Sequence, residues 1–397
     1  MDIAEVRALL TPAGLELLNS LGPVSSSDDV ARTVSRLRGA GHSPDLVSAV
    51  VTQARLRERA RSKFGEFAGR MLFTRAGLEQ ATRLSVAAHH AGRFRRADIE
   101  HVADLGCGIG GDALALASLG IRVDAVDADE VTAALATVNL APFSADVTVH
   151  HGLAEEQDLS GIEAVWLDPA RREAGETGRA RTEDWSPSLE WVFELTGRMP
   201  GGVKLGPGLD RDRIPDGYEA QWVSADGSTI ELVLWSGALA REGVTRSALV
   251  LRGQHAVELT APADSEDEPV RPLGQYIHEP DGAVIRARLI GQVARSLRAG
   301  ILAEKIAYLT GDEAVTSPFV QTFRVREVLP ADTKKLARAL KERGIGILEI
   351  KKRGVDVDPA ALRQSLKLKG EESATLIVTR IAGSRVAILA DRVPPAA

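Results

Sequence analysis

Apolar residues in the first hundred positions recur at the spacing of amphipathic helices. The first group consists of Leu9, Leu10, Leu15, Leu17 and Leu18. Ser27–Asp29 offers an N-cap for the next helix, Pro44 suits the first turn of a third, and another periodic stretch covers residues 73–90. The pattern therefore predicts a helical N-terminal region over residues 1–95.

From residue 101 onward, short apolar runs alternate with helical stretches. Strands are expected at residues 101–105, 121–126, 147–150, 164–167 and 202–205, and helices at 111–119 and 130–140. This alternation predicts an α/β fold with a parallel, doubly wound sheet. Turn signals at Asp226-Gly227 and Gly253-Gln254 add two hairpins, so the sheet should end in antiparallel strands. We assign this domain to residues 96–260.

An acidic, proline-bearing stretch follows the α/β domain. Residues 261–269 show no periodicity, which is typical of an exposed boundary, and we expect a linker over residues 261–283. Beyond it, the pattern predicts a helix over 284–299 and then strand, helix, strand, helix and two strands. Residues 284–397 are therefore expected to form a small α+β domain.

Composition narrows the class of protein. With 44% hydrophobic and 26% charged residues, the chain is not disordered, and 397 residues exceed one ordinary core. No apolar run approaches the roughly 18–20 residues of a membrane span, and the first residues do not resemble a secretory signal. A single cysteine excludes an intramolecular disulfide and a Cys-based zinc cluster. We expect a cytoplasmic enzyme with no membrane partner and no metal.

The net charge of −6 conceals a basic C-terminal segment. Residues 320–397 carry 16 Lys and Arg against 9 Asp and Glu, whereas the remainder carries 33 against 46. Eight of those cations lie in Lys334–Arg353, opposed only by Glu342 and Glu349. A solvated surface would explain such a run, and so would a polyanionic substrate steered by one end of the molecule.

The sharpest motif is Asp104-Leu-Gly-Cys-Gly-Ile-Gly-Gly-Asp112, between an expected strand and an expected helix. Glycines let a backbone lie against a ligand where a Cβ would collide. Asp127 ends the second strand, where a carboxylate can accept both hydroxyls of a ribose. The spacing also satisfies a dinucleotide fingerprint, but Asp104 would repel a pyrophosphate. It suits a ligand with an ammonium group and no phosphate, such as the methionine end of S-adenosylmethionine.

Two segments, DLGCGIGGD and VDAVDAD, resemble motifs I and II of class I S-adenosylmethionine-dependent methyltransferases. The resemblance covers roughly residues 101–235 and implies a Rossmann-like sheet with that cofactor. It also implies that the methionine moiety is held by Asp104, Gly106, Gly108 and Gly110, and the ribose by Asp127. The third motif departs from the family, since Gly152-Leu-Ala154 lacks the usual acid. The adenine contact is then left to backbone or to Glu155.

The run Asp168-Pro-Ala-Arg171 follows the fourth expected strand. Ligands of open α/β sheets bind outside the carboxyl ends of strands, so Asp168 should face the reacting methyl. The run resembles the (N/D/S)-P-P-(aromatic) motif of methyltransferases that act on amino groups of bases, including guanine-N2 enzymes. That resemblance implies catalytic roles for Asp168 and Pro169. Arg171 replaces the aromatic residue and would stack on the base or hold a phosphate.

Lys204 is expected at the end of the fifth strand, near the same edge. With Asp168, Glu231 and Lys63 it resembles the Lys-Asp-Lys-Glu set of ribose 2′-O-methyltransferases, where a lysine deprotonates the hydroxyl. We include Lys204 among the catalytic candidates. Methylation of a pyrimidine C5 is excluded, because it needs a thiolate and Cys107 belongs to the glycine loop.

The region from about residue 323 to 393 resembles, in element order and in its basic run, the THUMP-like module of some RNA-modifying methyltransferases. That resemblance implies phosphate contacts from Lys334, Lys335, Lys351, Lys352 and Arg353. A packing or dimerisation domain is the alternative.

The sequence thus predicts an S-adenosylmethionine-dependent methyltransferase that acts on a base nitrogen of structured RNA, either tRNA or rRNA. The alternatives are a ribose 2′-O-methyltransferase, a small-molecule or protein methyltransferase, and a non-catalytic protein that binds the cofactor and RNA. The oligomeric state stays open.

Overall fold

The computed structural model describes residue 1, residues 3–171 and residues 185–394. The chain divides into two compact units. The first comprises residues 1–205, 212–218 and 234–240, and the second comprises residues 206–211, 219–233 and 241–397. These units do not follow the predicted boundaries at residues 260 and 284.

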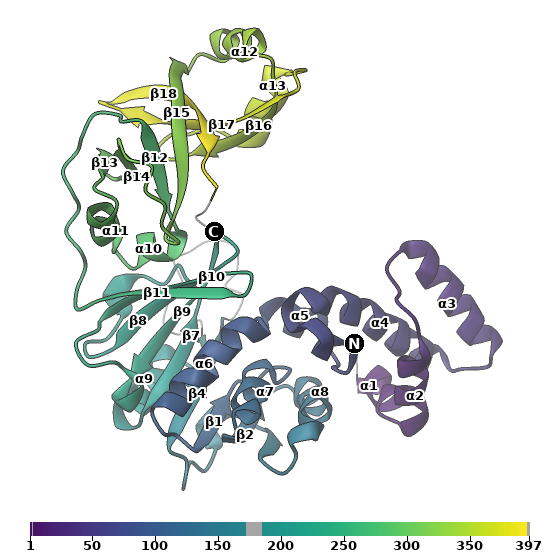
Figure 1. Ribbon diagram of the computed structural model, residues 1–397. Coiled ribbons are helices and arrows are strands. Elements are labelled where there is room, and N and C mark those ends of the chain that lie inside the picture. The colour runs from purple at the N-terminus through teal and green to yellow at the C-terminus, as the bar shows by residue number, and fades with distance from the viewer. Residues whose placement is uncertain (2, 172–184, 395–397) are drawn as a thin grey trace. The chain divides into compact units, whose positions relative to one another are not determined.

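The N-terminal region is helical (Figure 1). Its elements are α1 (Ile3–Leu9), α2 (Pro12–Ser20), α3 (Ser27–Gly39), α4 (Pro44–Phe64), η1 (Gly65–Gly69), α5 (Arg75–Gln80) and α6 (Leu84–Arg96). The cap of α3 lies one residue before the predicted one, because Ser26 and Asp29 form a reciprocal capping box. The periodic stretch 73–90 holds two helices rather than one, since the backbone is extended at Ala81 and Arg83.

The central sheet follows the predicted order of strands and helices. Its elements are β1 (His101–Leu105), α7 (Gly111–Ser118), β2 (Arg122–Asp127), α8 (Glu130–Leu140), η2 (Ala141–Phe143), β3 (Val147–His151), η3 (Ala154–Glu156), β4 (Ala164–Leu167), α9 (Leu189–Arg198), β7 (Gly201–Leu205), β8 (Glu219–Ala225), β9 (Ser228–Ser236), η6 (Gly237–Leu239), β10 (Arg246–Arg252) and β11 (His255–Ala261). The strand order is β11-β10-β8-β9-β7-β4-β1-β2-β3, and β1, β2, β3, β4 and β7 pair in parallel.

The sheet carries antiparallel strands at one end, as predicted. Strands β10 and β11 pair antiparallel, while β10 runs parallel to β8. Strands β8 and β9 are neighbours joined by the two-residue turn Asp226-Gly227, in which both residues have positive φ. Because β1 and β4 are central and almost wholly buried, the residues at their carboxyl ends are held by a rigid support.

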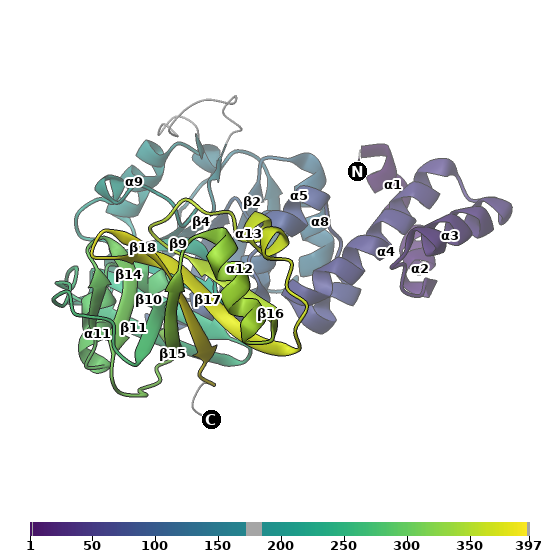
Figure 2. The same cartoon turned by 90° about the horizontal axis from the view of Figure 1, so that it is seen from above.

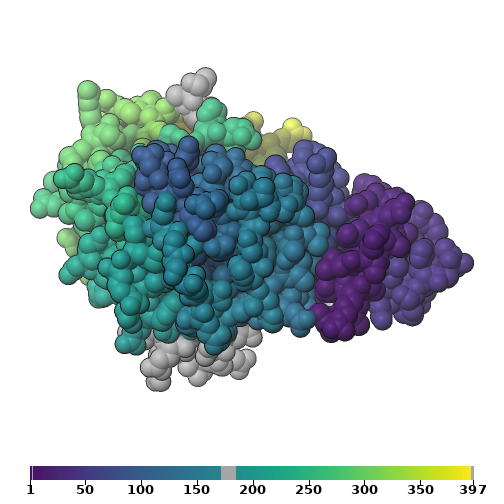
Figure 3. Space-filling view, turned by 90° about the horizontal axis from the view of Figure 1, so that it is seen from below, coloured from purple at the N-terminus to yellow at the C-terminus, as the bar shows by residue number. Residues whose placement is uncertain are grey.

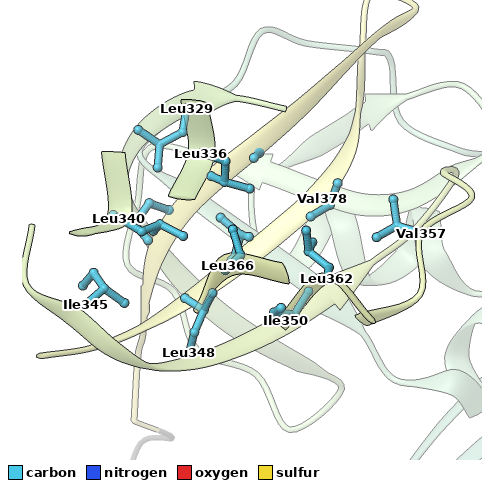
Figure 4. Close-up of a cluster of buried hydrophobic side chains, with 13 residues drawn as sticks. Leu329, Leu336, Leu340, Ile345, Leu348, Ile350, Val357, Leu362, Leu366 and Val378 are labelled. Carbon is cyan, nitrogen blue, oxygen red and sulfur yellow. The ribbon is translucent and has the colours of Figure 1, made fainter. Parts of the chain in front are cut away.

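The C-terminal sheet has seven strands, in the order β13-β14-β12-β15-β18-β17-β16. Its elements are β12 (Tyr276–Pro280), α10 (Gly282–Arg286), α11 (Ile290–Ser296), β13 (Gly300–Ala303), β14 (Ile306–Gly311), β15 (Val320–Pro330), α12 (Thr333–Glu342), β16 (Ile345–Lys352), α13 (Pro359–Leu366), β17 (Glu372–Ile381) and β18 (Ser384–Arg392). Figure 2 shows α12 and α13 together in front of this sheet. They pack on it through leucines such as Leu336, Leu340, Leu362 and Leu366 (Figure 4).

Two local predictions for this region need correction. The helix expected over residues 284–299 is two short helices, because Arg288 has a left-handed backbone with φ of 59° and ends α10. Strand β12 lies inside the stretch 261–283 expected to be irregular, and its Ile277 and His278 are buried.

Among the described residues, none of the helices has both the length and the apolar character that crossing a membrane requires.

Candidate active site

The glycine loop runs from the end of β1 to the start of α7 and has the backbone that its glycines permit. Gly106, Gly108 and Gly110 have φ values of 96°, 56° and 84°, a region that side chains rarely adopt. The amides of Gly106 and Cys107 both donate to the carbonyl of Val126, 2.9 Å away. Burial raises the pKa of the Cys107 thiol well above its ordinary value, so this cysteine is unsuited to be a nucleophile.

The loop lies directly against the end of β4. A Cβ on Gly106 would stand 2.9 Å from the backbone oxygen of Asp168, closer than real Cβ contacts come. By contrast, a Cβ on Gly108 would meet nothing within 4 Å, so that part of the loop borders open space. The glycine at position 106 therefore lets the predicted cofactor loop and the Asp168-Pro169 segment touch.

Asp104 is a buried carboxyl group near the end of β1. It is 1% exposed, and neither of its carboxyl oxygens has a hydrogen-bond partner among the described residues. Burial raises its pKa well above the ordinary value, and the nearby Asp112 and Asp168 raise it further, while Lys204 acts in the opposite direction. A buried group of this kind calls for a cationic or hydrogen-bonding ligand.

Asp127 stands at the end of β2 and faces the same loop. One of its oxygens accepts the amide of Gly108 and the other the amide of Asp129, both at 2.9 Å. Burial raises the pKa of Asp127, while these two amides lower it. The carboxylate is thus oriented by backbone, and each oxygen keeps a lone pair for another donor.

Lys204 and Asp168 form an ion pair where β7 and β4 end. Their charged groups approach to 2.5 Å, with the lysine side chain 10% exposed and the aspartate side chain 34% exposed. Pro169 next to Asp168 is buried. Arg171 pairs with Trp185 in the short strands β5 (Ala170–Arg171) and β6 (Trp185–Ser186), and its side chain lies outside what the structure describes.

The ion pair continues inward as a buried chain of polar side chains. Lys204 donates to the hydroxyl of Thr82 at 3.0 Å, and Thr82 donates to Asp112 at 2.8 Å. The Nδ1 atom of His90 lies 3.1 Å from the other oxygen of Asp112. We call this sequence, from His90 through Asp112, Thr82 and Lys204 to Asp168, the buried polar chain.

The surroundings of Asp112, in the middle of the buried polar chain, favour the ionised form of its carboxyl group. Burial alone would raise the pKa of Asp112, but the hydrogen bond from His90 and the charge of Lys204 lower it below the ordinary value. Lys204 therefore lies between two aspartates, Asp168 as its ion-pair partner and Asp112 within reach of its charge. The ring of His90 also stacks on Trp166, with centroids 4.6 Å apart, which fixes the inner end of the chain.

Lys63 bonds to backbone carbonyls, and burial together with the nearby charge of Lys204 lowers its pKa. Its ammonium group donates to the carbonyls of Leu78, Glu79 and Ala81 at 2.7–2.8 Å, and thereby caps the end of α5. Those bonds use all three of its donors, so Lys63 does not complete the four-residue set that the sequence suggested. Glu231, the other member of that set, is buried in β9.

Sequence reasoning missed Thr82 and His90. Asp112 closes the glycine motif, but nothing in its spacing indicates a bond to a residue 30 positions earlier. Nor does the adjacent pair of histidines at 89 and 90 indicate, from sequence, that His90 bonds to Asp112. The described residues contain no group of three or more His, Cys, Asp or Glu that could hold a metal ion.

The five basic residues predicted to contact RNA divide into two groups. Lys334, Lys335 and Lys352 are exposed. Lys351 pairs with Glu279 at 2.5 Å, and Arg353 lies 3.7 Å from the same carboxylate and over the ring of Tyr308. The last two are therefore largely neutralised within the C-terminal sheet.

The residues around the glycine loop fit S-adenosylmethionine. The orphaned carboxyl of Asp104 suits an ammonium group, the open side of Gly108 admits a ligand, and Asp127 suits a ribose. When bound, the cofactor would supply an electrophilic methyl group beside Asp168.

Comparisons with known proteins agree with this fit. The chain is 34% identical over 367 residues to an uncharacterized S-adenosylmethionine-dependent methyltransferase of Mycobacterium tuberculosis, found in strains CDC 1551 and H37Rv; the match covers 88% of this chain and 96% of that protein. A crystal structure of a proposed methyltransferase from Porphyromonas gingivalis W83 has a TM-score of 0.71 at 21% identity, covering 94% of this chain and all of that one.

Family models match both ends of the chain. Residues 320–392 match the THUMP domain-like family, which agrees with the predicted resemblance of the C-terminal region. Residues 2–60 match a domain of unknown function. Together with the long match to the mycobacterial relatives, these findings establish that the chain belongs to the S-adenosylmethionine-dependent methyltransferases.

Proposed function

We propose that the protein transfers the methyl group to a base nitrogen of structured RNA, with tRNA and rRNA as the substrate classes. The observation that carries the proposal is the ion pair between Lys204 and Asp168 at the end of β4, directly against the glycine loop. Asp168 and the carbonyl of the adjacent proline thus lie next to the expected donor site. Both groups can accept a hydrogen bond from an amine.

Once the amine is positioned, methyl transfer to its nitrogen needs little further catalysis. The carboxylate of Asp168 accepts a hydrogen bond from the amino group, which turns the nitrogen lone pair toward the methyl and stabilises the positive charge that develops there. Lys204, which pairs with Asp168, would orient this carboxylate rather than remove a proton. A ribose hydroxyl would need a general base, and Lys63 is engaged with three carbonyls.

Support for RNA comes from the C-terminal region. Its match to the THUMP domain-like family accords with a module that contacts RNA, and its exposed lysines at positions 334, 335 and 352 would meet phosphates. In the catalytic unit we propose that Asp104, Gly106, Gly108, Gly110 and Asp127 hold the cofactor. Asp168, Pro169 and Arg171 would hold the base.

The test is transfer from tritiated S-adenosylmethionine to total RNA from a strain that lacks the protein, followed by nucleoside analysis. We expect label in a methylated base, loss of that label with Asp168→Asn, and unchanged binding of S-adenosylhomocysteine. Asp146→Asn is the matched control, because Asp146 is exposed next to the start of β3, at the opposite edge of the sheet. Label in ribose, in protein or in small molecules would contradict the proposal.

A further inference from the structure

The N-terminal helices line most of an open hollow that the chemistry at Asp168 does not use. It has a volume of about 560 Å³ and lies within the first compact unit, between α2, the second half of α4 and Gly69-Arg70. Figure 3 shows the surface of these helices in purple. Part of its wall is apolar, from Leu15, Leu18 and Ala54. Its volume is in the range that binds small ligands or a single nucleotide.

Three guanidinium groups line this hollow, which we call the arginine hollow. They belong to Arg57, Arg61 and Arg70. Among the described residues of the lining, Glu58 is the one carboxylate, and it pairs with Arg61 at 3.2 Å. The lining therefore carries an excess of positive charge beside an apolar wall.

Arg57 bears a charge that no carboxylate of the described residues balances. Its Nε donates to the carbonyl of Met71 and its Nη1 to the side-chain oxygen of Asn19, both at 2.9 Å and both neutral acceptors. Burial lowers the pKa of Arg57 to about 10, so the group still carries its charge at neutral pH. A poorly solvated charge is costly unless an opposite charge lies near it, and an anionic ligand would supply that charge.

The rim of the arginine hollow is tied to the glycine loop. Leu72, two residues beyond Arg70, exchanges hydrogen bonds with the side chain of Asn139 at 2.6 and 2.9 Å. The amide nitrogen of Asn139 also donates to the carbonyl of Ile109 in the glycine loop, at 2.9 Å. All these atoms are buried, so the hollow keeps a defined position relative to the predicted cofactor site.

We infer that the arginine hollow binds a phosphate of the RNA substrate, with the attached nucleoside against its apolar wall. This inference rests on the proposed function, because RNA is its phosphate-bearing substrate. Guanidinium groups match the geometry of phosphate oxygens and can bind them in pairs. The helical region that matches a domain of unknown function would then hold the strand whose base reaches Asp168.

The experiment compares two charge reversals in the full chain. Arg70→Glu changes an exposed arginine of the hollow, and Arg122→Glu changes an exposed arginine at the start of β2, at the edge of the sheet opposite the glycine loop. The probes are fluorescently labelled total tRNA and GMP, with S-adenosylhomocysteine binding as the check on folding. We expect Arg70→Glu to weaken tRNA binding about tenfold and to reduce the salt slope by about 1, since one phosphate contact is lost. Arg122→Glu should behave as wild type.

Each other outcome is decisive. Equal tRNA affinity in the two variants would overturn the inference, while RNA methylation by the wild-type protein would leave the proposed function intact. Loss of GMP binding with unchanged tRNA binding would assign the hollow to a free nucleotide instead of RNA. Wild-type protein that neither binds tRNA nor labels RNA would overturn the inference together with the proposed function.

Discussion

Replacing Thr82 with valine should separate the buried polar chain from the packing around it. Valine has nearly the shape of threonine but lacks the hydroxyl that accepts from Lys204 and donates to Asp112. Lys204 then keeps Asp168 as its partner but loses the bond that fixes its direction. Asp168 should move relative to the methyl donor, although it does not touch Thr82.

The magnitude follows from the two lost bonds. Each involves a charged group, and such bonds contribute about 1.5–3 kcal/mol apiece, so the free energy of unfolding should fall by about 3–6 kcal/mol. A displacement of Asp168 by less than about 1 Å should lower kcat roughly 10- to 100-fold, with little effect on the KM for S-adenosylmethionine. Thr82→Ser restores the hydroxyl and should recover most of kcat.

The assay is steady-state transfer from labelled donor to whichever fraction the wild-type protein methylates, with urea unfolding in parallel. Thr196→Val is the control, because Thr196 is 3% exposed against 5% for Thr82, and its hydroxyl bonds to Val192 and Tyr218 rather than to the buried polar chain. It should lose stability but keep kcat. If Thr82→Val and Thr196→Val lost stability equally and both kept wild-type kcat, the positioning role of the chain would be refuted.

Three further results are expected. Asp104→Asn should weaken S-adenosylmethionine binding about 10- to 100-fold by calorimetry, because a charged hydrogen bond is lost. The same variant should stabilise the cofactor-free protein at neutral pH. The reason is that the pKa of Asp104 is raised in the folded state, so this carboxyl destabilises the folded state as pH rises above its pKa in the unfolded chain. Because the pKa of Asp104 is raised, the affinity of the wild-type protein for S-adenosylmethionine should increase with pH as Asp104 ionises. An affinity that did not change with pH would contradict this. Lys352→Glu should flatten the salt dependence of tRNA binding. Lys351→Ala should mainly lower the melting temperature, because Lys351 already pairs with Glu279. Equal salt slopes in the two variants would count against a phosphate contact at Lys352.

The fold of the catalytic region could be predicted well because its signals are local. Strand β1, helix α8 and the glycine loop appear where apolar spacing and glycines indicated them. The breaks between α5 and α6 and between α10 and α11 escaped prediction. They depend on backbone at Ala81 and Arg288 that neither glycine nor proline marks.

The sequence by itself determined the glycine loop, the acids at the ends of β1, β2 and β4, and the basic charge of the C-terminal region. These features reside in neighbouring residues and in strand order, which place the carboxyl ends of parallel strands at one edge. Only the tertiary structure decided which charges are balanced: Lys204 by Asp168, Lys351 by Glu279, and Arg57 by no carboxylate of the described residues. Such pairings join residues far apart in the chain, and their energies depend on burial, which spacing along a sequence does not encode.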